Sequence, residues 1–221
     1  MTRVEFDRQL AEIQEDMLVM GTMVETAVTR GIQALKDRDV DMARKIITDD
    51  VAINDKRYET EEKCLDLIAM QQPLATDLRT IASVLHITVD LERMGDHGEG
   101  IAKIAILLAD EPPLKPYIDI PRMGEIATSM LRGSIEAFRD RDTAKAREIV
   151  NRDDEVDALY DQVYRELLTF MINDPKTIER ATYLIWAAHN LERIADRVTN
   201  ICERVVYLVE GKIEDLNVSK Y

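Results

Sequence analysis

Residues 90–96 read DLERMGD, and residues 190–196 read NLERIAD. Leu, Glu, Arg and Asp therefore recur in the same order, 100 residues apart. The likeness extends upstream, because ALKDRD at residues 34–39 returns as AFRDRD at residues 137–142, now 103 residues apart. Segments that match in the same order are typical of an ancestral duplication. The chain is thus predicted to consist of two similar halves, each ending near one copy of the heptad.

The residues around the repeat are typical of long helices. Only 8 Gly and 6 Pro occur among the 221 residues, which favours helix over strand. Apolar residues recur mostly three or four positions apart from Leu10 to Leu35 and from Leu184 to Leu208, which is the period of an amphipathic helix. The predicted helices span residues 5–35, 39–70, 74–109, 122–139, 142–172 and 175–211.

Three prolines, Pro112, Pro113 and Pro116, separate the two halves, because proline lacks the amide proton that a helix interior needs. We therefore expect an all-α protein made of two tandem three-helix bundles related by internal duplication. Residues 1–110 form the first bundle, 111–121 the proline-rich connection, 122–211 the second bundle, and 212–221 a tail without evident structure.

The formal net charge of −14 limits the possible partners. Phosphate groups are bound mainly by Lys and Arg, so an acidic chain is unsuited to nucleic acid and suits cations or basic partners. The N-terminal residues lack the basic and then apolar layout of a signal peptide, and the longest apolar run, residues 104–109, is too short for a bilayer. We expect a cytoplasmic protein without direct membrane insertion.

The last helix carries acidic residues on the side away from its seam, the line of apolar residues that recur three or four positions apart. At about 100° per residue, the stripe of Glu192, Asp196, Asn200 and Glu203 comes out roughly opposite the seam from Leu184 to Leu208. The first heptad places Glu92 and Asp96 in the same way. These acids are therefore expected on the water-facing outside of each bundle.

The second helix of each half carries further oxygen donors four residues apart: Asp50 and Asn54, then Asp153 and Asp157 at the offset of 103. Carboxylates at this spacing repel by about 0.2–0.5 kcal/mol per pair, and a cation offsets that repulsion. Antiparallel neighbouring helices would bring the donors together, with His97 or His189 nearby. Such an oxygen-rich patch suits divalent magnesium, manganese, iron or zinc.

Catalytic motifs are not evident. A ferritin-like di-iron site needs Glu three residues before His, which His86, His97 and His189 all lack, and no Gly-rich phosphate loop or H-E-x-x-H is present. Two functions other than non-enzymatic metal binding stay open. One is a metal-dependent enzyme acting on phosphate esters, and the other is a metal-free helical scaffold with solvated acids.

Three stretches resemble the signature of the PhoU family, the phosphate-specific transport system accessory proteins: PLATDLRTI at residues 73–81, DLERMGDH at 90–97 and NLERIADRVTNI at 190–201. The resemblance implies a homodimer of PhoU-like, spectrin-repeat-like bundles that hold metal, iron in some members, on E(D)-x-x-x-D motifs. It also implies non-enzymatic negative regulation of phosphate uptake and of the phosphate-starvation response. The partners would be the ATPase of the phosphate ABC transporter and a sensor histidine kinase.

Carried onto this sequence, the family motifs place metal ligands at Asp50, Asn54, Glu92, Asp96, Asp153, Asp157, Glu192, Asp196 and Asn200. One departure concerns the last of these, because Gly100 occupies the position that Asn200 has in the second half. The first site is therefore expected to be weaker or to hold fewer ions than the second.

Overall fold

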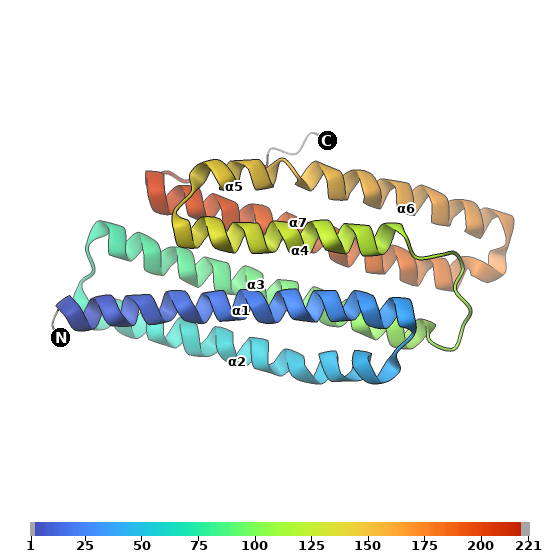
Figure 1. Cartoon of the computed structure of the whole chain (residues 1–221), viewed down its shortest axis with the longest axis horizontal. Helices are drawn as coiled ribbons and strands as arrows, with labels where there is room; N and C mark the ends of the chain where they lie inside the picture. Colours follow the sequence, from blue (N-terminus) through green and yellow to red (C-terminus); the bar gives the residue numbers. More distant parts are fainter. Residues whose placement is uncertain (1–2, 218–221) are drawn as a thin grey trace.

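A computed structural model describes residues 3–217 (Figure 1). These residues form α1 (Arg3–Asp37), α2 (Val40–Gln71), α3 (Ala75–Leu108), α4 (Asp119–Asp140), α5 (Thr143–Val150), α6 (Asp153–Asn173), the short 3₁₀ helix η1 (Pro175–Thr177) and α7 (Ile178–Glu210). The prediction of an all-α protein is confirmed. None of the helices within residues 3–217 combines the length and the apolar character that crossing a membrane requires.

The first bundle consists of α1, α2 and α3, each antiparallel to the one before (Figure 1). Asp39 caps α2, because its Oδ1 accepts a hydrogen bond of 2.9 Å from the backbone N–H of Met42. The helix ends at Gln71, and its C-cap residue Gln72, directly before Pro73, has a left-handed backbone (φ 41°). The boundaries of all three helices agree with the prediction to within two residues.

The second bundle repeats this plan with one interruption. The predicted helix over residues 142–172 is wrong as a single element, because α5 ends at Val150 and α6 begins at Asp153. Asp153, Asp154 and Glu155 fill the first turn of α6, where the exposed backbone N–H groups favour negative charge. The other difference is that α4 begins at Asp119, inside the stretch assigned to the connection.

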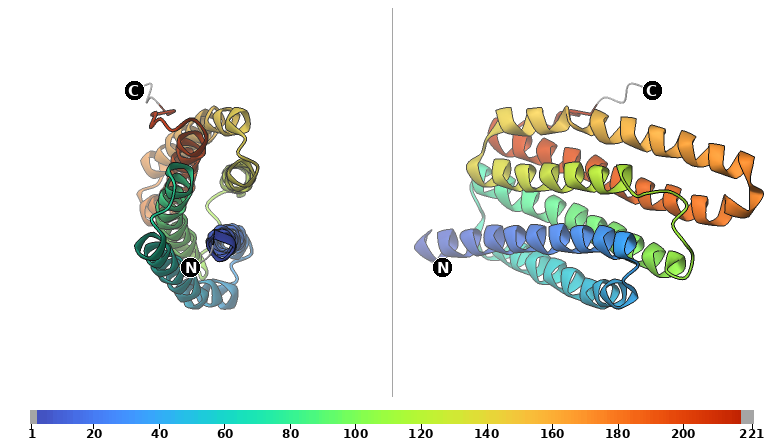
Figure 2. Two further views of the ribbon diagram at one scale, coloured as in Figure 1. Left: turned by 90° about the vertical axis from the view of Figure 1, so that its left-hand side faces the viewer. Right: turned by 45° about the vertical axis from the view of Figure 1, so that its right-hand side comes forward.

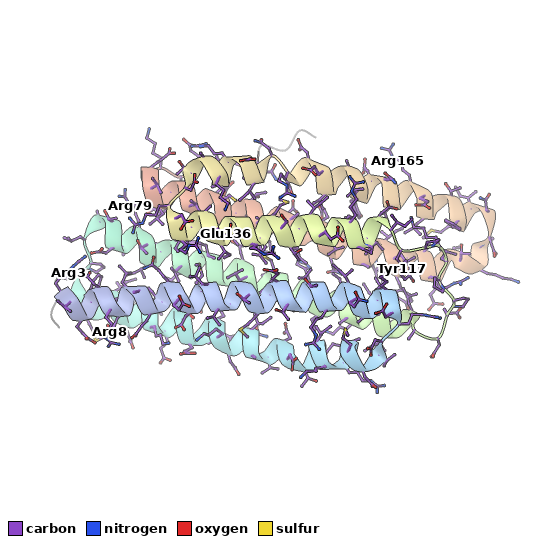
Figure 3. The ribbon with its side chains drawn as sticks, viewed as in Figure 1. Arg3, Arg8, Arg79, Tyr117, Glu136 and Arg165 are labelled. Carbon is purple, nitrogen blue, oxygen red and sulfur yellow. The ribbon has the colours of Figure 1, made fainter. Side chains whose placement is uncertain are left out.

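The connection is held against the core and against α6. Leu114 and Tyr117 pack on the hydrophobic core, and Figure 3 labels Tyr117 on this connection. The buried side chain of Lys115 donates a hydrogen bond of 3.1 Å to Asp119, and it also pairs with Glu166 of α6. These contacts fix the start of α4 beside α6.

The helices α3 and α7 lie at the centre of the molecule. They pack antiparallel against each other. This contact and the contact between α1 and α4 join the two bundles. The end view of Figure 2 shows the bundles stacked one above the other. Each of the two central helices also packs against the other long helices of its own bundle. Little of either helix is therefore left to face water, which determines where their acidic residues lie.

Candidate metal centres

Acidic side chains of α2 and α3 gather in the first bundle. Burial, followed by the charges of Glu99, Asp96 and Glu92, raises the pKa of Asp50 to about 6. The structure thus brings Asp50 of α2 close to the acids of the first heptad. Glu99, one turn beyond Asp96, was missed by the sequence analysis. We call Asp50, Glu92, Asp96 and Glu99 the first cluster.

The second bundle holds the corresponding acids of α6 and α7. Burial and the neighbouring charges of Asp157 and Asp196 raise the pKa of Asp153 to about 6. Burial and then the charge of Asp196 raise the pKa of Glu192 to about 7, and the pKa of Asp157 is raised for the same reasons. We call Asp153, Asp157, Glu192 and Asp196 the second cluster. Negative charges crowded together out of water are a setting in which a cation is stabilising.

The prediction that the heptad acids lie on the outer surface is wrong for Glu92, and Asp153 of α6 is buried as well. Glu92 is only 7% exposed and Asp153 only 3%. Glu92 is covered from within its own bundle, where Arg57 of α2 donates to it at 3.2 Å, and Asp153 of α6 accepts a hydrogen bond of 2.8 Å from Asn217. Asp96 and Asp196 keep side-chain exposures of 40% and 30%. Each cluster therefore joins a buried acid to one that water and ions reach.

Several carboxylate oxygens in these clusters are buried without a hydrogen-bond partner. Within residues 3–217 this holds for Glu92 Oε2, Asp153 Oδ1 and Glu192 Oε2, all from the predicted ligand set. Arg93 Nε lies 3.4 Å from the first and His189 Nδ1 3.1 Å from the third, both outside hydrogen-bond geometry. Leaving a buried charged oxygen unpaired costs about 1–3 kcal/mol or more. Glu92 and Glu192 occupy matching positions, so each half contains a buried carboxylate oxygen that lacks a hydrogen-bond donor.

The clusters are not preassembled metal sites. Among the described residues, no three His, Cys, Asp or Glu side chains converge tightly enough to hold a metal ion as they stand. The acids of neighbouring helices are close enough for their charges to add to burial in raising the pKa of Asp50 and Asp153, but they do not converge on a single centre. Closure on an ion therefore requires rotation of side chains, and Asp96 and Asp196 would exchange their bonds with Arg93 and Arg193 for bonds to the ion.

The two clusters are neutralised to different degrees. In the first bundle Arg57 Nη1 donates to Glu92 Oε1 at 3.2 Å. At the offset of 103 the second bundle has Tyr160 instead, whose pKa is raised by burial and then by the charge of Glu192. Comparing Arg57 with Tyr160 in the sequence would have revealed this difference. Both clusters contain an arginine beside the exposed acid, Arg93 with Asp96 and Arg193 with Asp196. The first cluster has in addition the guanidinium of Arg57 from α2, and the second has no cation at the matching position of α6.

The structure places Asn200 in the contact between α3 and α7. Its Nδ2 donates to Asp90 Oδ1 at 3.2 Å, and Arg197 donates to the same oxygen at 2.9 Å. A Cβ at Gly100 would lie 3.2 Å from Asn190 Oδ1, tighter than an ordinary contact. Gly100 therefore reflects the close approach of the two central helices, and the expected weakness of the first site has a better physical basis in Arg57.

His97 also belongs to this contact, with Nδ1 2.9 Å from Asn190 Oδ1. The other histidine that the sequence analysis placed near the patch, His189, contacts a cluster acid, with its Nδ1 3.1 Å from Glu192 Oε2. Asn54 donates from Nδ2 to Asp50 Oδ2 at 3.1 Å, so its amide supports the first cluster.

Comparisons with known proteins agree with this architecture. The family model "PhoU domain" matches residues 17–105 and again residues 120–205. Homologues named phosphate-specific transport system accessory protein PhoU from Aquifex aeolicus and Clostridium acetobutylicum are 42% and 41% identical, covering 93% and 98% of this chain and 93% and 100% of their own.

Solved structures agree as well. The crystal structure of PhoU from Pseudomonas aeruginosa superposes with a TM-score of 0.90 at 36% identity, covering 94% of this chain and 100% of that one. The phosphate transport system regulatory protein PhoU from Streptococcus pneumoniae gives 0.89 at 34% identity, covering 95% and 99%. Two matched domains, close relatives along nearly the whole chain and the same fold lead to one conclusion: the protein belongs to the PhoU family.

Proposed function

We propose that the protein is a cytoplasmic, non-enzymatic regulator of phosphate transport that binds metal ions at both acidic clusters. The observation that carries the metal binding is the buried, unpartnered carboxylate oxygen at the matching positions Glu92 and Glu192. The role in phosphate transport rests on the relatives, which are named accessory or regulatory proteins of that system.

The donor chemistry fits hard or borderline cations. Carboxylate oxygens suit magnesium, manganese and iron, and zinc also accepts them. The first ion or group of ions would be held by Asp50, Glu92 and Asp96, and the second by Asp153, Asp157, Glu192 and Asp196. A bound cation would supply positive charge to two clusters whose acids now raise one another's pKa.

The partners proposed for this regulator are the ATPase of the phosphate ABC transporter and a sensor histidine kinase, with a homodimer as the working form. The net charge of −14 favours basic surfaces on such partners. Binding of this kind restrains phosphate uptake when phosphate is plentiful, which makes the protein a negative regulator.

Metal content tests the site. Purified wild-type protein is expected to carry more metal by elemental analysis than a Glu192→Ala/Asp196→Ala variant prepared in parallel, because the variant lacks two acids of the second cluster. Equal metal content in both proteins would contradict a metal site at the second cluster. Phosphatase assays with metal supplied are expected to show no turnover, and turnover that disappears in Asp196→Ala would favour a metal-dependent enzyme instead.

Phosphate uptake tests the role. Cells that lack the protein are expected to take up labelled phosphate faster than cells that have it, and wild-type protein should restore the restraint. The Glu192→Ala/Asp196→Ala variant, expressed to the same level, should restore it poorly. Uptake that is the same with and without the protein would contradict the proposed role.

A further inference from the structure

The C-terminal tail reaches the second cluster. Gly211 ends α7 in a left-handed conformation (φ 73°), and the described chain then turns back to end beside the junction of α5 and α6 (Figure 1). Two bonds anchor it: the backbone N–H of Leu216 donates to Glu203 Oε1 at 3.0 Å, and Arg147 of α5 pairs with Glu214 at 2.9 Å. The side chain of Leu216 packs on the core.

Beyond Leu216, the tail contacts a cluster acid directly. Asn217 Nδ2 donates to Asp153 Oδ2 at 2.8 Å. The other oxygen of Asp153, Oδ1, is buried and has no partner. One oxygen is thus held by a neutral amide while the second is free to accept a cation. This arrangement orients a carboxylate without neutralising it.

The first half achieves the same arrangement with a different residue. There the amide of Asn54 donates to Asp50 Oδ2 at 3.1 Å, from within the same helix. At the offset of 103 the counterpart of Asp50 is Asp153, but the counterpart of Asn54 is the carboxylate Asp157. The second half has therefore exchanged its local amide for a further acid, and Asn217 of the tail supplies the amide instead.

We propose that Asn217 is a positioning residue of the second metal centre, and that an ion bound there and the docked tail stabilise each other. This inference rests on the proposed metal binding. Groups that hydrogen-bond to a ligating carboxylate fix its orientation, and their loss typically lowers metal affinity about 10-fold to 100-fold. Because coupling is reciprocal, an ion that binds more tightly to the docked form stabilises docking by the same factor.

Titration of the full chain with Mn²⁺ tests whether Asn217 positions the second metal centre. In a background where Glu92→Ala and Asp96→Ala disable the first cluster, adding Asn217→Ala is expected to weaken binding about 10-fold. Adding Asn54→Ala to the same background removes an equivalent amide from the disabled cluster and should leave the affinity unchanged. Equal melting temperatures of the metal-free proteins would establish that the fold is intact.

Hydrogen exchange tests whether the bound ion stabilises the docked tail. A tail with only a structural role would not give the expected result. Saturating Mn²⁺ should slow amide exchange in residues 213–217 about 10-fold in the wild type, and not in Glu192→Ala/Asp196→Ala. The proposal would be overturned if Asn217→Ala bound Mn²⁺ as tightly as the background or more tightly, or if Mn²⁺ did not change amide exchange in the tail. Either result would leave the metal site standing. Absence of Mn²⁺ binding to the wild type would overturn both.

Discussion

Replacing Glu192 by glutamine is expected to stabilise the metal-free protein at neutral pH and to have little effect near pH 5. The folded protein raises the pKa of Glu192 from 4.5 to about 7, chiefly through burial and the charge of Asp196. Other charged groups that face it are Arg193, which lowers the pKa, and Asp157 and Asp153 of α6, which raise it. Glutamine keeps the shape and never ionises.

The sign follows from proton linkage. Between pH 4.5 and about 7 the folded state binds more protons at Glu192 than the unfolded state does, so the free energy of unfolding falls as pH rises. Stability from this group is full below the unfolded pKa and is lost above the folded one. A shift of about 2.5 units corresponds to about 3 kcal/mol, and the side chain is only 20% exposed, so solvent screening is limited.

Urea unfolding of both proteins between pH 5 and pH 7.5 measures this effect. With metal removed, the wild type should lose stability relative to Glu192→Gln as pH rises. Added Mn²⁺ should then restore the wild type at pH 7.5, by about 2.7 kcal/mol at 100 times its dissociation constant, and affect the variant much less. A constant difference across the pH range would mean that Glu192 has an ordinary pKa.

Exchanging Arg57 and Tyr160 between the clusters is expected to exchange their affinities. Arg57→Tyr removes the guanidinium that donates to Glu92, and Tyr160→Arg introduces one beside Glu192. At about 6 Å and an effective dielectric constant of about 40–80, a guanidinium repels a divalent ion by about 1–3 kcal/mol. The first cluster should therefore bind Mn²⁺ about 10-fold to 100-fold more tightly, and the second should weaken by a similar factor.

The exchange has a matched control in Arg8, which lies near the start of α1 and pairs with Glu5 and Glu12 (Figure 3). Arg8→Tyr changes the net charge by the same amount away from both clusters, and it should leave both affinities unchanged. If Arg57→Tyr changes binding no more than Arg8→Tyr does, the counter-charge does not set the difference between the clusters.

Most of the fold was predictable because it depends on local signals. The three-and-four spacing of apolar residues, the cap at Asp39 and the prolines at 112, 113 and 116 are properties of short stretches. The interruption between α5 and α6 was missed because neither Gly nor Pro marks it, and the first half continues as one helix at the same offset. Boundaries set by tertiary contacts, such as the start of α4 beside Lys115, leave no such mark.

The sequence predicted which residues make up the candidate sites better than it predicted what surrounds those residues. The heptad indicated Glu92 and Glu192, but their surroundings depend on how α2 packs on α3 and α6 on α7, which periodicity within one helix does not report. The contact of Asn200 with Asp90 also arises between helices from different halves. Asn217 left no sequence signal, because the residues after Gly211 have no repeat counterpart near the first cluster.

Anomalous scattering from crystals grown with Mn²⁺ tests most directly whether cations occupy the two clusters. The expected result is anomalous density in both, within about 2.0–2.6 Å of oxygens that include those of Glu92 and Glu192. A map with no density at either cluster, in which the same oxygens bond to ordered water or to turned side chains, would contradict the account.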